Sequence, residues 1–157
     1  NDSRSGRDFV AALERAVPEG AELGVVAWRE QFLLYLSRPI THFGHSRWRE
    51  ERKEAEDAAV WLAATPGRVL LVNGRSLEQC FGSTERKWIG KSGRENWWLV
   101  QGPPDAECVA KGNKARERIY RPPETPAGHL LPRPERQTGR SGQLRGRSPA
   151  PGTRLHP

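Results

Sequence analysis

The clearest pattern of apolar positions lies in residues 60–76, which read VWLAATPGRVLLVNGRS. Pro66 and Gly67 stop a helix here, and the apolar residues resume as the unbroken run from Val69 to Val72. A short apolar run without alternation is typical of a strand covered on both faces, as in a helix-flanked, largely parallel sheet. Because the turn at Asn73-Gly74 then leads into another helix, this stretch predicts an α/β core.

The same order of helix, Pro-Gly and strand occurs earlier in the chain. Ser5 and Asp8 have the spacing of a capping box, in which a hydroxyl and a carboxylate satisfy backbone N–H groups at the start of a helix. Apolar residues then recur on one helical face up to Pro18, and residues 23–27 (LGVVA) follow as a strand. The repetition supports successive α/β units over a helical bundle.

Between these two units the pattern is more ambiguous. The segment from Trp28 to Pro39 is consistent with a buried strand, but its Glu, Gln and Leu residues favour a short helix that ends before the proline. Residues 40–43 (ITHF) follow as a strand. A long helix is predicted for residues 47–64, capped by Ser46, with an apolar stripe of Trp48, Ala55, Ala59 and Leu62.

The charged residues of this long helix alternate in sign. Arg52 with Glu56, and Lys53 with Asp57, have the i,i+4 spacing of ion pairs on a helix surface. Interleaved carboxylates would repel nucleic-acid phosphates, so we predict a solvated helix face and not a nucleic-acid reader.

The remaining apolar segments predict a short helix and a hairpin. Ser76 and Gln79 form another capping box, which opens a helix through Phe81. Residues 86–90 and 97–100 are predicted to pair as strands across a loop longer than two residues, formed by residues 92–96. The fold expected is therefore an α/β domain in which helices flank a mixed, mostly parallel sheet with a C-terminal antiparallel hairpin.

Composition sets the predicted domain limits. The α/β domain is expected to span residues 1–104, followed by a loosely attached segment, 105–120, and a disordered tail, 121–157. The tail holds seven Arg, no Lys and two Glu, so it carries five of the seven net positive charges of the chain. It lacks enough apolar surface to offset the entropy of ordering. It is interpreted as a solvated tail, a frameshifted sequence, or an arm for phosphates or anionic lipid head groups.

Candidate chemistry is sparse. If Arg38 and His42 flank the end of a strand, they could together bind an anionic group of a substrate, whereas the bland alternative for His42 is a hydrogen-bonded histidine at a strand end. His42 and His45 are three residues apart without a Cys or Asp nearby, so no metal site is expected. The turn at residues 73–76 is a weak phosphate-site candidate without a glycine-rich motif, and ordinary helix capping is favoured there.

Two further residue classes leave alternatives open. Cys80 and Cys108 are too far apart in sequence for a metal-type pair; a buried thiol is favoured for Cys80, although one disulfide would be possible in an oxidising compartment. Trp88, Trp97 and Trp98 form either a stacking platform for bases or sugar rings, or ordinary core. No membrane-spanning segment or signal-peptide core is found and the chain has no Met, so a processed product or fragment that is soluble as supplied is expected.

Three segments carry a resemblance to a known family: NDSRSGR at the start, ELGVVAWREQFLLYLSRPITHFG at 22–44, and AEDAAVWLAATPGRVLLVNG at 55–74. They look like the C-terminal soluble domain of bacterial polyprenyl-phosphate-dependent membrane glycosyltransferases. These enzymes are similar to the aminoarabinose lipid A transferase and the dolichyl-phosphate-mannose protein mannosyltransferases. The resemblance covers roughly residues 1–102, and the tail departs from it.

The resemblance implies a periplasmic domain on the outer face of the bacterial inner membrane. Its partners would be the transmembrane part of the same polypeptide and, through the whole enzyme, the polyprenyl-phosphate sugar and a lipid or protein acceptor. No catalytic residue and no cofactor is carried over to this chain, which would be inactive by itself. The alternative is an independent α/β protein that binds a sugar-phosphate or a nucleic acid, of which the nucleic acid is disfavoured because residues 1–120 are nearly neutral.

Overall fold

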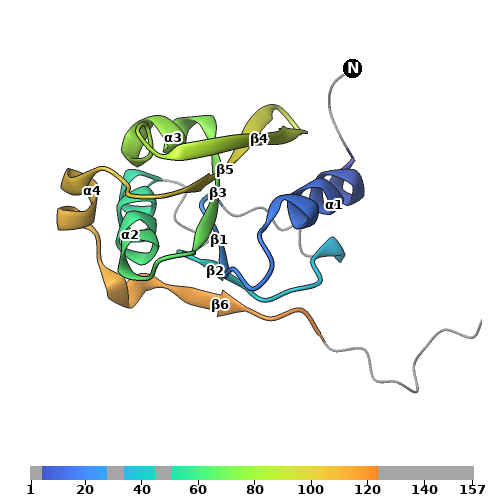
Figure 1. The fold of residues 1–157 in the computed structure, drawn as a ribbon, viewed down its shortest axis with the longest axis horizontal. Coiled ribbons are helices and arrows are strands. Elements are labelled where there is room, and N and C mark those ends of the chain that lie inside the picture. The colour runs from blue at the N-terminus through green and yellow to red at the C-terminus, as the bar shows by residue number, and fades with distance from the viewer. Residues whose placement is uncertain (1–4, 28–33, 45–50, 124–157) are drawn as a thin grey trace, which may run out of the picture. The chain divides into compact units, whose positions relative to one another are not determined.

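The computed structural model describes residues 5–27, 34–44 and 51–123. Within these residues six strands form one sheet in the order β4-β5-β3-β1-β2-β6 (Figure 1). The strands are β1 (Leu23–Val25), β2 (Ile40–His42), β3 (Val69–Asn73), β4 (Glu85–Ser92), β5 (Glu95–Gln101) and β6 (Arg118–Tyr120). The helices are α1 (Gly6–Ala16), α2 (Glu51–Ala64), α3 (Gly74–Cys80) and α4 (Ala106–Lys111), with a 3₁₀ turn at Lys114–Arg116.

The predicted α/β class is confirmed, and the strand directions differ from the prediction. Strand β1 pairs in parallel with β2 and β3, as expected for α/β units. The other three pairings, β2 with β6, β3 with β5 and β4 with β5, are antiparallel. The sheet is therefore mixed and mostly antiparallel, because the hairpin joins one edge of the parallel strands and β6 joins the other.

The sheet separates two apolar layers. In Figure 1 it runs down the middle, with α1 on one side and α2, α3 and α4 on the other. The first core packs α1 through Phe9, Val10 and Leu13 against alternate residues of the strands. The second core contains Ala55, Ala58, Ala59, Trp61 and Leu62 of α2, Leu77 and Cys80 of α3, and Cys108 of α4.

Strand β3 lies at the centre of both layers. All four residues from Val69 to Val72 are at most 1% exposed, as the unbroken apolar run predicts. Val69 and Leu71 belong to the first core, and Leu70 and Val72 belong to the second. This alternation is the period-two geometry of a strand that is covered on both faces.

Close packing of α2 against β1 explains why a glycine occupies position 24. A Cβ atom at Gly24 would lie 2.8 Å from the Trp61 ring and 2.9 Å from Leu70 Cδ1. Trp61 is also in edge contact with Phe43, with ring centroids 6.0 Å apart. Glycine therefore lets the buried indole of α2 lie directly on the sheet.

The hairpin is confirmed, but its turn is shorter than expected. Strands β4 and β5 pair from Glu85↔Gln101 to Ser92↔Glu95, which leaves Gly93 and Arg94 as a two-residue loop. Gly93 has a φ of 66°, which suits the primed turns favoured in two-residue hairpins. The pairing shifts register between Trp88 and Gly90, as a β-bulge does.

Segment 105–120, expected to be loosely attached, instead contributes to the folded unit. Cys108 of α4 forms a disulfide with Cys80 of α3. Strand β6 pairs with β2 through Ile40↔Tyr120 and its two neighbouring pairs. The first compact unit of the chain ends at Pro122, which is 18 residues beyond the predicted limit at Pro104.

Three predictions about local structure have different outcomes. The Ser5 cap of α1 is confirmed, because its Oγ accepts a hydrogen bond from the Asp8 N–H at 3.2 Å. The helix predicted before Pro39 is not present in the described part, where Leu34 and Tyr35 form a 3₁₀ turn. Residues 28–33, and Ser46 and Trp48 of the long-helix prediction, lie outside the described residues.

Candidate functional site

The carboxyl ends of the parallel strands meet at one edge of the sheet. Strands β1, β2 and β3 run in the same direction, so Ala27, His42 and Asn73 are at or just beyond this edge. Ligands of open α/β sheets commonly bind at such an edge. It is therefore the first place in which to look for a functional site, and two acidic side chains reach it from neighbouring elements.

The first of these acids is Glu54 of α2. It is 3% exposed, and its Oε1 accepts a hydrogen bond from the Ala27 N–H at 2.8 Å. Ala27 has a φ of 65°, a left-handed conformation that is costly for a residue with a Cβ atom. The buried carboxylate thus holds a strained turn at the end of β1. Such strain is found at functional sites when the surrounding structure enforces it.

The second is Glu95, at the start of β5, which contacts Asn73. The Asn73 amide donates from Nδ2 to Glu95 Oε1 at 3.0 Å, and its Oδ1 accepts from the Ser76 N–H at 3.0 Å. Asn73 is therefore the N-cap of α3, and it lies three residues before Ser76, the cap that the sequence predicts. Its side chain takes up an N–H group of the first helical turn that a phosphate would otherwise use, so the turn serves as a helix cap.

Arg38 lies just before β2 and faces α1. Its Nε is buried and lies 3.7 Å from Glu14 Oε2, which is an ion-pair distance but too long for a hydrogen bond. The same carboxylate accepts from the Ser37 N–H at 3.0 Å and from the Ser37 hydroxyl at 2.6 Å. Arg38 therefore belongs to a joint between the segment before β2 and α1.

His42 is the last residue of β2. Its Nδ1 accepts a hydrogen bond from the Gly44 N–H at 3.3 Å, in a turn where Gly44 has a φ of 101°. Arg38 and His42 thus lie on opposite sides of Ile40 along the chain. Arg38 contacts Glu14 of α1, whereas His42 contacts Gly44 in the turn after β2. The structure does not show them converging on one ligand, and their contact with a substrate stays a prediction.

The prediction of a solvated face for α2 is wrong for three acidic residues whose burial is described. Glu54, Glu56 and Asp57 are 3%, 8% and 4% exposed. Asp57 Oδ1 accepts a hydrogen bond from the Asn113 N–H at 2.6 Å, a contact that the predicted surface pair with Lys53 does not include. The predicted pair of Arg52 with Glu56 is present, with Nε 3.6 Å from Oε2.

The sequence does contain a signal for the burial of Glu54, Glu56 and Asp57. The small residues Ala55, Ala58 and Ala59 lie next to them, and all three are fully buried. Small side chains on several sides of a helix allow close approach of more than one neighbour. The charge pattern concealed this signal, because alternating charges are usually solvated.

A pocket of about 570 Å³ lies at the opposite end of the sheet from Asn73. Its lining includes Thr65, Pro66 and Arg68 between α2 and β3, and Gln101 at the end of β5. The Arg68 guanidinium lies 4.5 Å from the centroid of a Trp61 ring, and its Nη1 donates to the Trp61 carbonyl oxygen at 2.8 Å. Its Nη2 lies 3.4 Å from a carboxylate oxygen of Glu22. The bond to the Trp61 carbonyl oxygen caps the C-terminal part of α2, so Arg68 has a structural role.

The three hairpin tryptophans do not form one platform. Trp97 is fully buried in the first core, in edge contact with Phe9 at a centroid distance of 6.3 Å. Trp98 packs with the second core, on the opposite face of the sheet. Trp88 pairs with Trp98 across the strands and is 49% exposed, with its Nε1 donating to Asn96 Oδ1 at 3.2 Å. The core interpretation is thus correct for Trp97.

The disulfide replaces the buried thiol expected for Cys80. Cys80 and Cys108 are 0% and 2% exposed, and their Cα atoms are 5.8 Å apart. The backbone also links the two helices here, because the Asp105 N–H donates to the Cys80 carbonyl oxygen at 2.9 Å. The bridge therefore connects α3 and α4 inside the second core.

The surface of α4 carries a perturbed carboxyl group. The hydrogen bond that Lys111 donates to Glu107 at 2.9 Å lowers the pKa of Glu107, and the charge of Lys111 adds to the effect. Both residues are exposed, one helical turn apart, so this is a surface ion pair of the i,i+4 type. It does not indicate a catalytic acid.

The described residues contain neither a metal-binding group nor a membrane-spanning helix. Residues 5–27, 34–44 and 51–123 contain no group of three or more His, Cys, Asp or Glu side chains placed to hold a metal ion. In the same ranges no helix has the length and apolar character needed to cross a bilayer. In comparisons with known proteins, no family model, no curated protein and no solved structure matches the chain.

Proposed function

We propose that this chain is the extracytoplasmic domain of a membrane glycosyltransferase, which moves a sugar from a polyprenyl-phosphate carrier to a lipid or protein acceptor. The observation that carries the extracytoplasmic placement is the disulfide between Cys80 and Cys108. Disulfides persist in oxidising compartments such as the bacterial periplasm and are rare in the cytosol. Because both halves are buried between α3 and α4, the bridge is part of the fold and not an exposed redox pair.

The glycosyltransferase part of the proposal rests on the resemblance over residues 1–102. Its most specific segment, WREQFLLYLSRPITHFG, includes the described residues 34–44. These form strand β2 and the joint of Ser37 and Arg38 with Glu14. In this role the chain provides a scaffold, and the reaction takes place in the transmembrane part of the same polypeptide. The domain would cap that active site or help to place the acceptor.

The placement can be tested in intact cells by the state of the two thiols. The natural full-length protein is expressed, denatured in acid, and treated with a thiol-reactive polyethylene glycol with and without prior reduction. We expect reduction to add two labels to the parent beyond those that a Cys80→Ser/Cys108→Ser variant gains, and the two proteins to carry equal numbers of labels without reduction. More labels on the parent than on the variant without reduction would contradict an extracytoplasmic position.

The enzymatic role requires a transfer assay with the natural full-length protein. Membranes are supplied with a polyprenyl-phosphate sugar, and the labelled acceptor is counted. We expect transfer to fall at least tenfold when residues 1–122 are deleted in frame, and the chain of 157 residues to transfer no sugar by itself. A coding sequence without membrane-spanning segments upstream of Asn1 would contradict the proposal. It would leave an independent binding protein as the function.

A further inference from the structure

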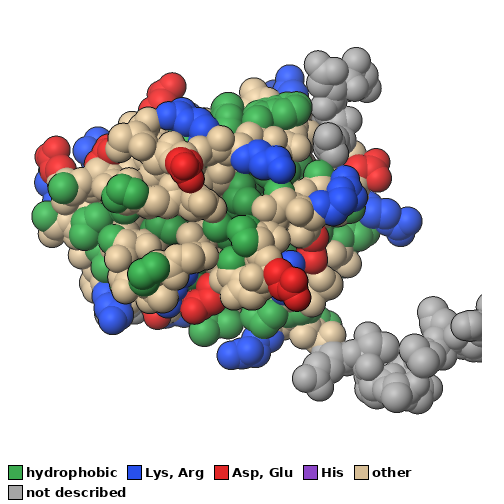
Figure 2. All heavy atoms as spheres, in the orientation of Figure 1, with side chains coloured by type: hydrophobic (Ala, Val, Ile, Leu, Met, Phe, Trp, Pro, Cys, Tyr) green, Lys and Arg blue, Asp and Glu red, His purple; other side chains and the backbone are tan. Residues whose placement is uncertain are grey.

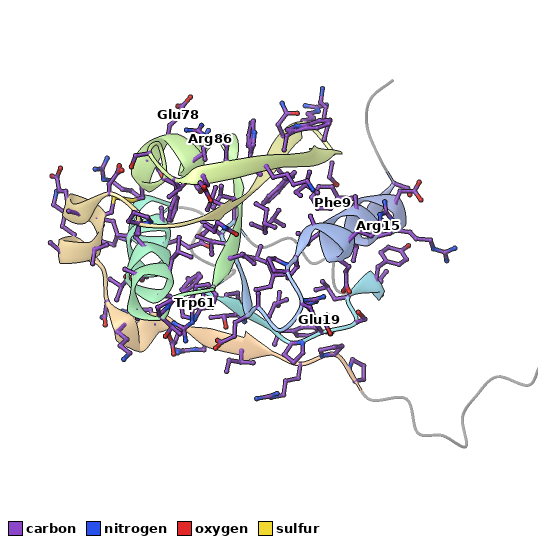
Figure 3. All side chains as sticks on the ribbon, viewed as in Figure 1. Phe9, Arg15, Glu19, Trp61, Glu78 and Arg86 are labelled. Carbon is purple, nitrogen blue, oxygen red and sulfur yellow. A yellow bond between two sulfur atoms is a disulfide. The ribbon has the colours of Figure 1, made fainter. Side chains whose placement is uncertain are left out.

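An exposed apolar pair lies beside the first turns of α1. Leu34 is 80% exposed and Tyr35 is 40% exposed. The guanidinium carbon of Arg7 lies 5.8 Å from the centroid of the Tyr35 ring, so this aromatic side chain and the start of α1 form one surface. Arg15 lies two turns further along the exposed side of α1 (Figure 3). We call Arg7, Arg15, Leu34 and Tyr35 the Leu34 patch.

The patch is anchored to the fold. Leu36, next in the chain, is 8% exposed and belongs to the first core. Ser37 is fixed to α1 by the two hydrogen bonds that it donates to Glu14. The backbone on the C-terminal side of Leu34 and Tyr35 is therefore held against α1, and these side chains are presented on a supported turn.

The charge around the patch is mainly positive. Lys87 of β4 lines a shallow pocket together with Arg15, which extends the positive charge towards the hairpin. The acidic residues of α1 are Asp8 and Glu14. Asp8 is exposed, whereas Glu14 faces Ser37 and Arg38. Figure 2 shows charged side chains of both signs with apolar side chains between them over the visible face.

Leu, Tyr and Arg in one exposed group match the chemistry of a bilayer surface. A leucine side chain enters the boundary of the acyl chains, a tyrosine ring lies at the level of the head groups, and arginines pair with lipid phosphates. Single exposed apolar residues are common on proteins and need no partner. Here an aromatic ring and a cation in direct contact accompany the leucine.

The charge of the patch favours a bilayer over a second protein. Arg7, Arg15 and the neighbouring Lys87 carry three positive charges beside the exposed carboxylate of Asp8, and anionic lipid phosphates complement such a surface. Under the proposed function, the domain is joined to a membrane-embedded part of the same polypeptide, which keeps it close to the bilayer.

We propose that the Leu34 patch is the face through which this domain contacts the bilayer, with Leu34 inserted and Arg7 and Arg15 bound to anionic lipid head groups. The inference rests on the proposed function, because it assigns the side of the domain that is turned towards the membrane. It also predicts a property of the domain that can be measured without sugar transfer, namely binding to vesicles.

The test uses the full chain of 157 residues and vesicles of phosphatidylglycerol and phosphatidylcholine. Because the seven Arg of residues 121–157 could bind anionic vesicles by themselves, all proteins in the series carry these arginines as Gln. Flotation with the vesicles gives the partition coefficient. We expect Leu34→Asp to lower it at least fivefold. Ile119→Asp, the same change at a 58% exposed position of β6, should leave it unchanged.

A second pair of variants tests the arginines. Arg7→Ala should lower binding to phosphatidylglycerol vesicles about threefold and have no effect with phosphatidylcholine alone, because the contact is with the anionic head group. Arg94→Ala, in the exposed turn of the hairpin, is the matched control and should bind as the parent does. Circular dichroism melting of each variant shows that it is folded.

The outcomes separate this inference from the proposed function. Equal binding of the parent and Leu34→Asp, or no vesicle binding at all, would overturn the inference, and the latter would indicate that the patch contacts protein. If the cysteines are protected in cells but vesicle binding does not depend on Leu34, the proposed function is retained and another face of the domain is turned towards the membrane. Reactive cysteines together with Leu34-dependent binding would indicate a peripheral membrane protein instead.

Discussion

The helices on the two sides of the sheet are held in place by different interactions. On the first side, α1 packs through Phe9, Val10 and Leu13 onto the strands, and its polar joint with the rest of the fold is the contact of Glu14 with Ser37 at the surface. On the second side, α2, α3 and α4 share an apolar core. That core also contains a disulfide and buried carboxylates that bind backbone N–H groups.

This difference indicates which side determines the geometry of the domain. Apolar burial is non-directional, so α1 can adjust its position at a small energetic cost. A buried carboxylate and a disulfide have specific geometry and fix the positions of the groups they join. We therefore expect the second side to be the rigid scaffold, and the first side to be the one that adapts to a contacting surface.

The largest effect is expected at the strand shared by both sides. Leu70 is fully buried and faces the second core. Leu70→Asp would place a carboxylate there without a partner, a change that costs several kcal/mol or shifts its protonation. Because a domain of this size is stable by roughly 5–15 kcal/mol, we expect this variant to lose its cooperative melting transition in circular dichroism. A melting curve equal to that of the parent would show that β3 is not the core strand.

Removal of the disulfide tests the covalent part of the second side. The bridge spans 28 residues, so the double variant Cys80→Ala/Cys108→Ala should lose roughly 3–4 kcal/mol of unfolding free energy in urea denaturation. Hydrogen exchange should accelerate most in α3 and α4. A uniform increase over α1 and α4 alike would contradict the division of the domain into two differently held sides.

Close packing between α4 and α2 is tested at Gly112. A Cβ atom there would clash with the carbonyl oxygen of Glu56 and with Val60, although the φ of −76° suits any residue. We expect Gly112→Ala to reduce stability by about 1–3 kcal/mol through overpacking. Gly82→Ala, where a Cβ atom would meet nothing within 4 Å, is the control and should change it by less than about 0.5 kcal/mol.

Much of the fold could be predicted because its signals are local. The unbroken run Val69 to Val72 identified the central strand, and the spacing of Ser5 and Asp8 identified the start of α1. The direction of strand pairing has no such local signal. Strand β6 begins 76 residues after β2 ends, and the hairpin joins β3 rather than extending a parallel series. For this reason the sheet is less parallel than the sequence suggested.

The polar contacts and the disulfide between distant segments could not be predicted either, because they too have no local signal in the sequence. Asp57 binds the N–H of Asn113, which is 56 residues away, and Cys80 pairs with Cys108 across 28 residues. The sequence predicts a surface pair of Asp57 with Lys53, because the spacing of charges on a helix is visible in the sequence. A backbone donor from a distant segment is not visible there. Arg38 is a candidate site residue from the sequence alone, but no sequence signal shows that its partner is Glu14 of α1.

Removal of one carboxylate on each side compares the two sides directly, and the smaller loss is expected on the α1 side. Asp57→Ala leaves the partly buried Asn113 N–H without that acceptor, which should cost about 1–3 kcal/mol. Glu14→Ala removes two acceptors from the exposed Ser37, where water can replace them, and the partly exposed ion pair with Arg38, so the expected loss is about 0.5–1 kcal/mol. Both values can be measured by urea denaturation. Equal losses for the two variants would mean that the joint on the α1 side is as specific as those around α2, and that α1 is not the adaptable side.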